Sequence, residues 1–173
     1  MAEDDMLRFR PYKSCDAAAI VSWIGGERDF RKWCADRFDS YPITAGDLNR
    51  HYDSFADSDS FFPMTAEDEN GPVGHLIMRF ADKEKSVVRF GFVIVDNRRR
   101  GQGYGKRMLQ MAASFAFDDL KAEKITLGVF ENNPAARFCY LTAGFRDVVR
   151  ETNEYYHILD ENWKCLEMEM TSR

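Results

Sequence analysis

A short segment rich in glycine and basic residues is the clearest candidate for a binding site. It follows an apolar run that ends at Val95 and consists of Arg100, Gly101, Gln102, Gly103, Tyr104, Gly105 and Lys106. Glycines let a backbone approach an anion closely, and the free amides at the start of a helix point toward such an anion. The segment therefore predicts a phosphate cradle, with a flexible solvated turn as the alternative, because glycine motifs alone often mislead.

Two common phosphate-binding motifs do not fit this segment. A Walker A loop needs a glycine where the chain has Arg100, and a serine or threonine where it has Arg107. A dinucleotide fingerprint puts Lys106 or Met108 at its third glycine, depending on which glycine starts the count. A P-loop is therefore excluded, and a Rossmann-type site is disfavoured.

The elements next to this turn must position it. Residues 85–95, rich in Val, Ile and Phe, predict a central strand, and the apolar spacing of residues 104–118 predicts a helix packed on a sheet. Residues 124–130 predict the next strand. Asn133, as a side-chain cap before a proline, opens a second helix that Gly144 ends. The turn is thus expected at a strand-to-helix junction.

The rest of the chain predicts further strands and helices around that junction. Ser14 is expected to cap a helix, and Thr44 and Asp47 form a predicted capping box. The remaining predictions are a strand at 6–12, a helix at 28–38, a hairpin of 60–66 and 72–80 with a type I′ turn at Asn70-Gly71, and a closing strand pair at 145–152 and 163–170.

Two motifs together carry a family resemblance. Arg100-x-x-Gly103-x-Gly105 is followed one strand later by Asn133-x-x-Ala136-x-x-x-Tyr140-x-x-x-Gly144-Phe145. This pair resembles the signature of the GNAT superfamily of N-acetyltransferases, and the order of elements is similar over nearly the whole chain. The resemblance implies one α+β domain over residues 1–173, in an α/β/α arrangement. Its mixed, mostly antiparallel central sheet of about seven strands would carry helices on both faces.

The resemblance also implies an activity. An acetyl group would pass from acetyl-coenzyme A to a primary amine of a small molecule or peptide, by direct attack in a ternary complex and without a metal. An amino acid, a polyamine, an aminoglycoside or a peptide N-terminus would all fit as acceptor. A non-catalytic acyl-coenzyme A sensor is the alternative, and an acyl group other than acetyl is a weaker one, to be decided by pocket depth near Phe90 and Phe92.

Site residues follow from the resemblance position by position. The amides from Gly101 to Lys106 would hold the pyrophosphate, and the backbones of Val93 and Val95 would bind the pantetheine arm where two central strands splay apart. Asn133 and Ala136 would contact the cosubstrate from the other side. Tyr140 would be the general acid that protonates the departing thiolate.

The general base is the point where the chain departs from its family. Many relatives carry a glutamate on the central strand, where this chain has Arg89. We take Glu131 as the candidate base, alongside a water chain to solvent. The other candidates are His75, Tyr155, Tyr156 and His157.

Aromatic residues are frequent in the N-terminal third. They are Trp23, Phe30, Trp33, Phe38 and Tyr41. Core packing accounts for most of them. In the family, however, this segment walls the acceptor site, so one or two are expected to line a substrate pocket. Cys139 is expected to be packed rather than nucleophilic.

Composition bounds the remaining possibilities. A chain of 173 residues with 45% hydrophobic content suits one domain. A net charge of -5 argues against nucleic-acid binding, while a local cationic patch of residues 98–100 together with Lys106 and Arg107 suits a small polyanion. The acidic segment 1–5 and the absence of a long apolar run indicate neither a signal peptide nor a membrane span, so we expect a cytoplasmic protein.

Four widely spaced cysteines suggest neither zinc nor disulfides, and a monomer or a homodimer is compatible with the sequence.

Overall fold

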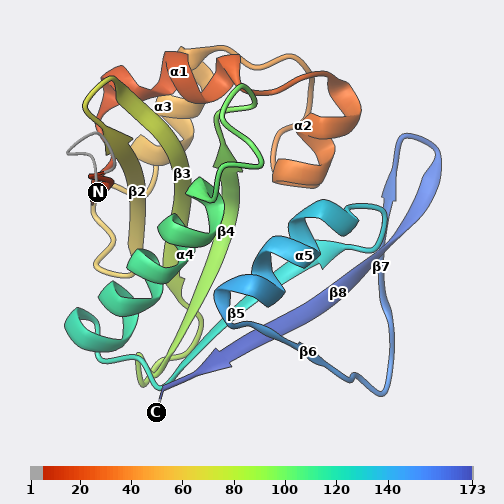
Figure 1. Ribbon diagram of the computed structural model, residues 1–173. Helices are drawn as coiled ribbons and strands as arrows, with labels where there is room; N and C mark the ends of the chain where they lie inside the picture. The colour runs from red at the N-terminus through yellow and green to blue at the C-terminus, as the bar shows by residue number, and fades with distance from the viewer. Residues whose placement is uncertain (1–5, 173) are drawn as a thin grey trace.

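The computed structural model describes residues 6–172, which form an eight-stranded sheet with helices on both faces (Figure 1). The strand order is β1-β2-β3-β4-β5-β8-β6, and β7 also pairs with β8. Neighbouring strands are antiparallel except β4 and β5, which are parallel. The predicted fold class is thus confirmed, with one strand more than the expected seven. The acidic segment 1–5 lies outside the described residues.

The elements have the following bounds. The strands are β1 (Arg8–Pro11), β2 (Phe61–Asp68), β3 (Gly71–Phe80), β4 (Val87–Val95), β5 (Lys124–Phe130), β6 (Arg146–Val148), β7 (Glu154–Ile158) and β8 (Glu161–Thr171). The helices are α1 (Ala17–Ser22), α2 (Glu27–Cys34), α3 (Ala45–Asp53), α4 (Tyr104–Ser114) and α5 (Pro134–Ala143). A π-helical turn (Phe115–Asp119) extends α4, and a 3₁₀ turn (Ser14–Asp16) precedes α1.

Two hydrophobic cores lie on the two faces of the sheet. Helices α4 and α5 pack on one face, where Val88 and Phe90 of β4 are buried. Helices α1, α2 and α3 pack on the other face, against Phe92 and Ile94 of the same strand. Residues two apart normally share a face of a strand, so β4 must reverse its alternation between Phe90 and Phe92.

A β-bulge produces this reversal. The register between β3 and β4 shifts between His75 and Ile77, and Phe92 has a φ of 51°. An extra residue in one strand moves all later side chains to the opposite face. The bulge therefore lets one continuous apolar strand serve both cores.

Strands β4 and β5 diverge soon after they meet. Only Val87–Arg89 pairs with Lys124–Thr126. Beyond Arg89 the two strands separate, as Figure 1 shows from the bottom of the view upward. The backbone of residues 90–95 on the β5 side is consequently left out of the sheet ladder.

Two predicted local details are wrong. Ser14 lies inside a 3₁₀ turn whose N-cap is Lys13, because the Asp16 carboxylate accepts the Lys13 amide at 2.8 Å. The β2–β3 hairpin is confirmed, but Asp68 pairs directly with Gly71, and only Gly71 of the predicted turn pair has a positive φ, 116°. The turn at Asn70-Gly71 is therefore not type I′.

Other boundaries also differ from the prediction. Helix α2 ends at Cys34, four residues before Phe38, and the predicted closing pair of strands is instead three strands. Short β6 and β7 both pair along β8, β6 with Glu167–Glu169 and β7 with Glu161–Cys165. The capping box of α3 is confirmed, since the Thr44 and Asp47 side chains each accept the other's backbone amide.

Candidate active site

A cavity of about 820 Å³ lies where β4 and β5 diverge. Its walls come from residues 90–95 of β4, residues 127–129 of β5, the glycine-rich turn and the helices α4 and α5, with α1 and α2 closing one end. The volume falls in the range of small-molecule sites. Among the lining residues are Val93, Val95, Arg100, Gly101, Gly103, Tyr104, Gly105, Lys106, Asn133, Ala136 and Tyr140. The structure thus brings together every predicted cosubstrate residue except Gln102, which is exposed outside the lining.

The glycine-rich turn has an open backbone. Gly101 and Gly103 have φ values of 77° and 84°, and a Cβ built on either would meet no heavy atom within 4 Å. Positive φ is the region that favours glycine. Because α4 begins immediately afterwards at Tyr104, its first amides have no partner within the helix. The residues present therefore fit an anionic group such as a pyrophosphate.

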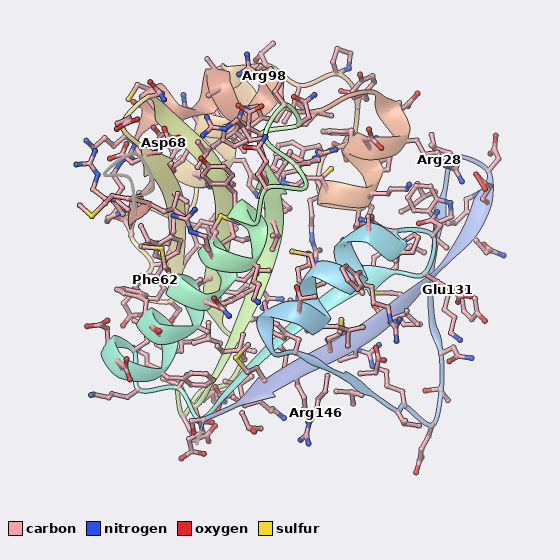
Figure 2. The ribbon with its side chains drawn as sticks, in the orientation of Figure 1. Arg28, Phe62, Asp68, Arg98, Glu131 and Arg146 are labelled. Atoms are coloured by element: carbon pink, nitrogen blue, oxygen red, sulfur yellow. The ribbon has the colours of Figure 1, made fainter. Side chains whose placement is uncertain are left out.

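Ion pairs anchor this turn to the sheet. Arg99 donates to Asp68 at 2.6 Å and also to the Tyr104 hydroxyl, and Arg98 donates to Asp96 at 3.0 Å. Burial alone would raise the pKa of Asp68, but the hydrogen bond from Arg99 lowers it overall. Figure 2 labels Asp68 and Arg98, one member of each of these two ion pairs.

These ion pairs reduce the number of basic side chains in the predicted cationic patch that are available to a bound anion. Arg98 pairs with Asp96 and Arg99 pairs with Asp68, whereas Arg100 pairs with neither aspartate. Arg100 and Lys106 both line the cavity. A bound polyanion would therefore meet these two side chains and the open amides, rather than the whole basic run.

The exposed edge of β4 offers backbone groups to a ligand. Beyond Arg89 no β5 residue pairs with this strand, so an extended ligand can add to it as a strand would. The bulge at Phe92 sits in the middle of that edge. It is held from α2, because Trp33 Nε1 donates a hydrogen bond to the Phe92 carbonyl at 2.9 Å.

Helix α5 supplies the opposite wall. Asn133 is its N-cap but makes no side-chain capping hydrogen bond, contrary to the prediction, and it lines the cavity instead. Tyr140, 7% exposed, also lines the cavity. Burial raises the pKa of Tyr140, so its hydroxyl keeps its proton at neutral pH. A Cβ on Gly105 would come within 3.0 Å of the Cys139 sulfur, so this glycine permits the close approach of α4 and α5.

The five predicted base candidates lie outside the cavity lining. The Glu131 side chain is 63% exposed and lies 3.9 Å from Lys164, and in Figure 2 it is across the molecule from Arg98. His75 is fully buried, hydrogen-bonds Tyr52 at 2.6 Å, and burial lowers its pKa to about 3. Tyr155, Tyr156 and His157 lie on β7, away from the lining.

Asp29 is a cavity residue that the sequence analysis missed. It lies on α2 and is the one acidic residue among the described lining residues. A surface aspartate in a short amphipathic helix has no sequence signal that separates it from a solvated charge. Of the five aromatics considered, Trp23 and Trp33 line the cavity, while Phe30, Phe38 and Tyr41 pack against one another beside it.

Residues 6–172 hold neither a metal-binding cluster of side chains nor a membrane-spanning helix. Within that range, no group of three or more His, Cys, Asp or Glu side chains is arranged to hold a metal ion. No helix in the same range is long and apolar enough to cross a membrane.

The comparisons with known proteins agree with this geometry. The model of the acetyltransferase (GNAT) family matches residues 28–145. The chain therefore belongs to the GNAT acetyltransferase family and is an acyltransferase. The acyl donor of this family is acetyl-coenzyme A.

Solved structures share the fold. One is a spermidine N-acetyltransferase from Vibrio cholerae in complex with CoA and spermine, with a TM-score of 0.79 and 19% identity over 95% of both chains. Another is a spermidine/spermine N-acetyltransferase of the same organism in complex with manganese ions, with a TM-score of 0.72 and 19% identity over 98% of this chain and 95% of that one. At these identities the likeness is one of fold.

Proposed function

We propose that the protein transfers an acetyl group from acetyl-coenzyme A to a primary amine of a small molecule or peptide, by direct attack in a ternary complex. The observation that supports this most is the shared cavity. A glycine turn with open amides and an unpaired strand edge meet in this cavity. The turn suits the pyrophosphate of the cosubstrate, and the strand edge suits its pantetheine arm.

The cosubstrate contacts divide between these features. The backbone amides from Gly101 through Gln102 to Lys106, with the Arg100 side chain, would hold the pyrophosphate. The backbones of Val93 and Val95 would bind the pantetheine arm as an added strand. Asn133 and Ala136 would contact it from α5.

The reaction needs one proton donor and one proton acceptor. The amine nitrogen forms a bond to the thioester carbonyl carbon, the carbon–sulfur bond breaks, and the thiolate takes a proton. Tyr140 is the proposed donor, since its raised pKa keeps the hydroxyl protonated until sulfur needs the proton. We propose Asp29 as acceptor of the amine proton because it is the acidic residue among the described cavity-lining residues, with Glu131 as the alternative.

Calorimetric titration tests the cosubstrate site. Acetyl-coenzyme A and coenzyme A are expected to bind in the micromolar range, with ATP and NAD as comparators. Release of free thiol with a panel of amines then tests the transfer. Binding without transfer to any amine would favour an acyl-coenzyme A sensor, whereas a preference for ATP or NAD would contradict the proposed site.

A further inference from the structure

The cavity between β4 and β5 is lined by residues from both faces of the sheet. The glycine turn, α4 and α5 lie on one face. On the other, Gly91 of β4 and Gly128 of β5 both line the cavity without a side chain. A Cβ on Gly128 would come within 3.1 Å of the Arg89 guanidinium, so this guanidinium lies beside the Gly128 part of the lining. An acceptor amine that meets a cosubstrate held on the α4 and α5 side would approach it from this arginine-bearing side.

Two arginines lie side by side next to this part of the cavity, just outside its lining, and Arg79 is exposed. Arg79 of β3 and Arg89 of β4 are direct cross-strand partners, an arrangement in which like charges repel. Arg89 is compensated, because it donates to Glu167 at 2.7 Å and to Thr126 at 3.2 Å. Arg79 forms no ion pair with any residue in the described range.

A third arginine adds to the same positive field. Arg37, in the segment after α2, is close enough to lower the pKa of Arg79. Loss of hydration is the largest cause of that lowering, followed by the charges of Arg89 and then Arg37. Arg37 likewise contributes to the lowered pKa of His51 on α3.

The acidic groups nearby are already engaged. Glu167 is shared between Arg89 and Arg150, and Glu154 pairs with Arg150. Among these arginines, Arg89 and Arg150 share the carboxylates of Glu167 and Glu154, whereas neither Arg37 nor Arg79 forms an ion pair with a described residue. A guanidinium without a carboxylate partner can bind an anion, and its planar fork matches a carboxylate in geometry.

Resting on the proposed function, we propose that the acceptor is an amine that also bears a carboxylate, and that Arg79, assisted by Arg37, binds this carboxylate. A polyamine, which carries only positive charge, would be repelled from the same face. The site thereby selects for an amino acid-like acceptor.

Matched pairs of acceptors test the inference. Thiol release is measured with lysine against cadaverine, ornithine against putrescine, and phenylalanine against phenethylamine, within a panel of all common amino acids and their decarboxylated counterparts. The carboxylate-bearing member of an accepted pair is expected to have the higher kcat/KM. For that member, Arg79→Gln should raise KM about tenfold to hundredfold with little change in kcat, while leaving the carboxyl-free amine unaffected.

Further variants separate binding from a structural role. Arg79→Lys should retain part of the preference because it keeps the charge, and Arg37→Gln should weaken it less than Arg79→Gln. Arg8→Gln, on the distant strand β1, is the control and should change nothing. Since Arg79→Gln removes a repulsion, it should leave the melting temperature unchanged or higher.

The outcomes distinguish the two proposals. Equal use of both members of every pair, or an Arg79→Gln variant with an unchanged preference, overturns the carboxylate site and leaves the acetyltransferase intact. Failure to acetylate any amine, of either set, overturns the proposed function and the inference with it.

Discussion

The indole of Trp33 donates a hydrogen bond to the backbone carbonyl of Phe92 at 2.9 Å, and the two rings lie 4.8 Å apart. This contact joins α2 to the bulge of the central strand. A non-glycine residue with a φ of 51° is sparsely populated and persists only where its surroundings hold it. Trp33 is thus a positioning residue for the unpaired edge of β4.

Replacing Trp33 tests this positioning role. Trp33→Phe keeps an aromatic ring but removes the donor, so we expect a loss of about 1 kcal/mol in the free energy of unfolding. The kcat/KM for transfer should fall by more than the smaller fraction of folded protein explains, because the edge of β4 loses its fixed shape. Denaturant unfolding and steady-state kinetics on the same samples measure both effects. A variant with unchanged kcat/KM would show that the bulge holds without Trp33.

The turn depends on positive φ at Gly103. Because a Cβ at this position meets no atom within 4 Å, the cost of Gly103→Ala is backbone strain of about 1–2 kcal/mol. Affinity for coenzyme A should fall accordingly. Gly103→Asn, whose side chain tolerates the left-handed region, should retain more affinity than the alanine variant. Equal affinity of the two variants, measured by calorimetry, would argue against a conformational origin.

Tyr140 is predicted to contribute to the chemical step rather than to the binding of acetyl-coenzyme A. Tyr140→Phe keeps the buried ring but removes the proton donor, so kcat should fall about hundredfold while the affinity for acetyl-coenzyme A is preserved. Single-turnover measurements separate the chemical step from product release. A fall in affinity with unchanged kcat would place Tyr140 in cosubstrate binding instead.

The proton acceptor can be identified by paired variants. Asp29→Asn should lower kcat/KM about hundredfold, because the amine then loses its proton without a positioned carboxylate. Glu131→Gln should be close to wild type, since that side chain is exposed outside the cavity lining. The reverse result would assign the role to Glu131, and two unaffected variants would indicate release of the proton to water.

Stability is expected to fall in mild acid because of His75. Burial lowers its pKa to about 3, against an ordinary value of 6.5, so between these values the unfolded chain binds a proton that the folded chain does not. The contribution of neutral His75 to the free energy of unfolding is therefore fully present above pH 6.5 and is lost as the pH falls from 6.5 toward 3. At pH 5 the loss amounts to about 2 kcal/mol.

Two measurements check this origin. Denaturant unfolding at pH 7 and pH 5 should show a smaller difference for His75→Gln than for the wild type. His157→Gln, which changes an exposed histidine, should leave the difference as it is. The imidazole resonances of His75 should stay constant from pH 8 to pH 5, and a midpoint near 6.5 would contradict the expectation.

Much of the site was predictable because its signals are local. A glycine-rich basic turn between an apolar strand and an amphipathic helix specifies its conformation through neighbouring residues. The Asn133-to-Gly144 spacing likewise places cavity residues on one side of a single helix. For the same reason the capping box at Thr44 was predicted correctly, since all of its bonds lie within four residues.

What the tertiary structure decided depends on contacts between distant segments. The bulge at Phe92 reverses the faces of β4, yet the uniform apolar run there carries no trace of it, because either face of the strand is buried. Asp29 and Glu131 are both plain acidic residues in the sequence and both are exposed, and only the tertiary structure places Asp29 in the cavity lining and Glu131 outside it. The charge of Arg79 is unbalanced only because strand register sets it beside Arg89 while Glu167 turns to other partners.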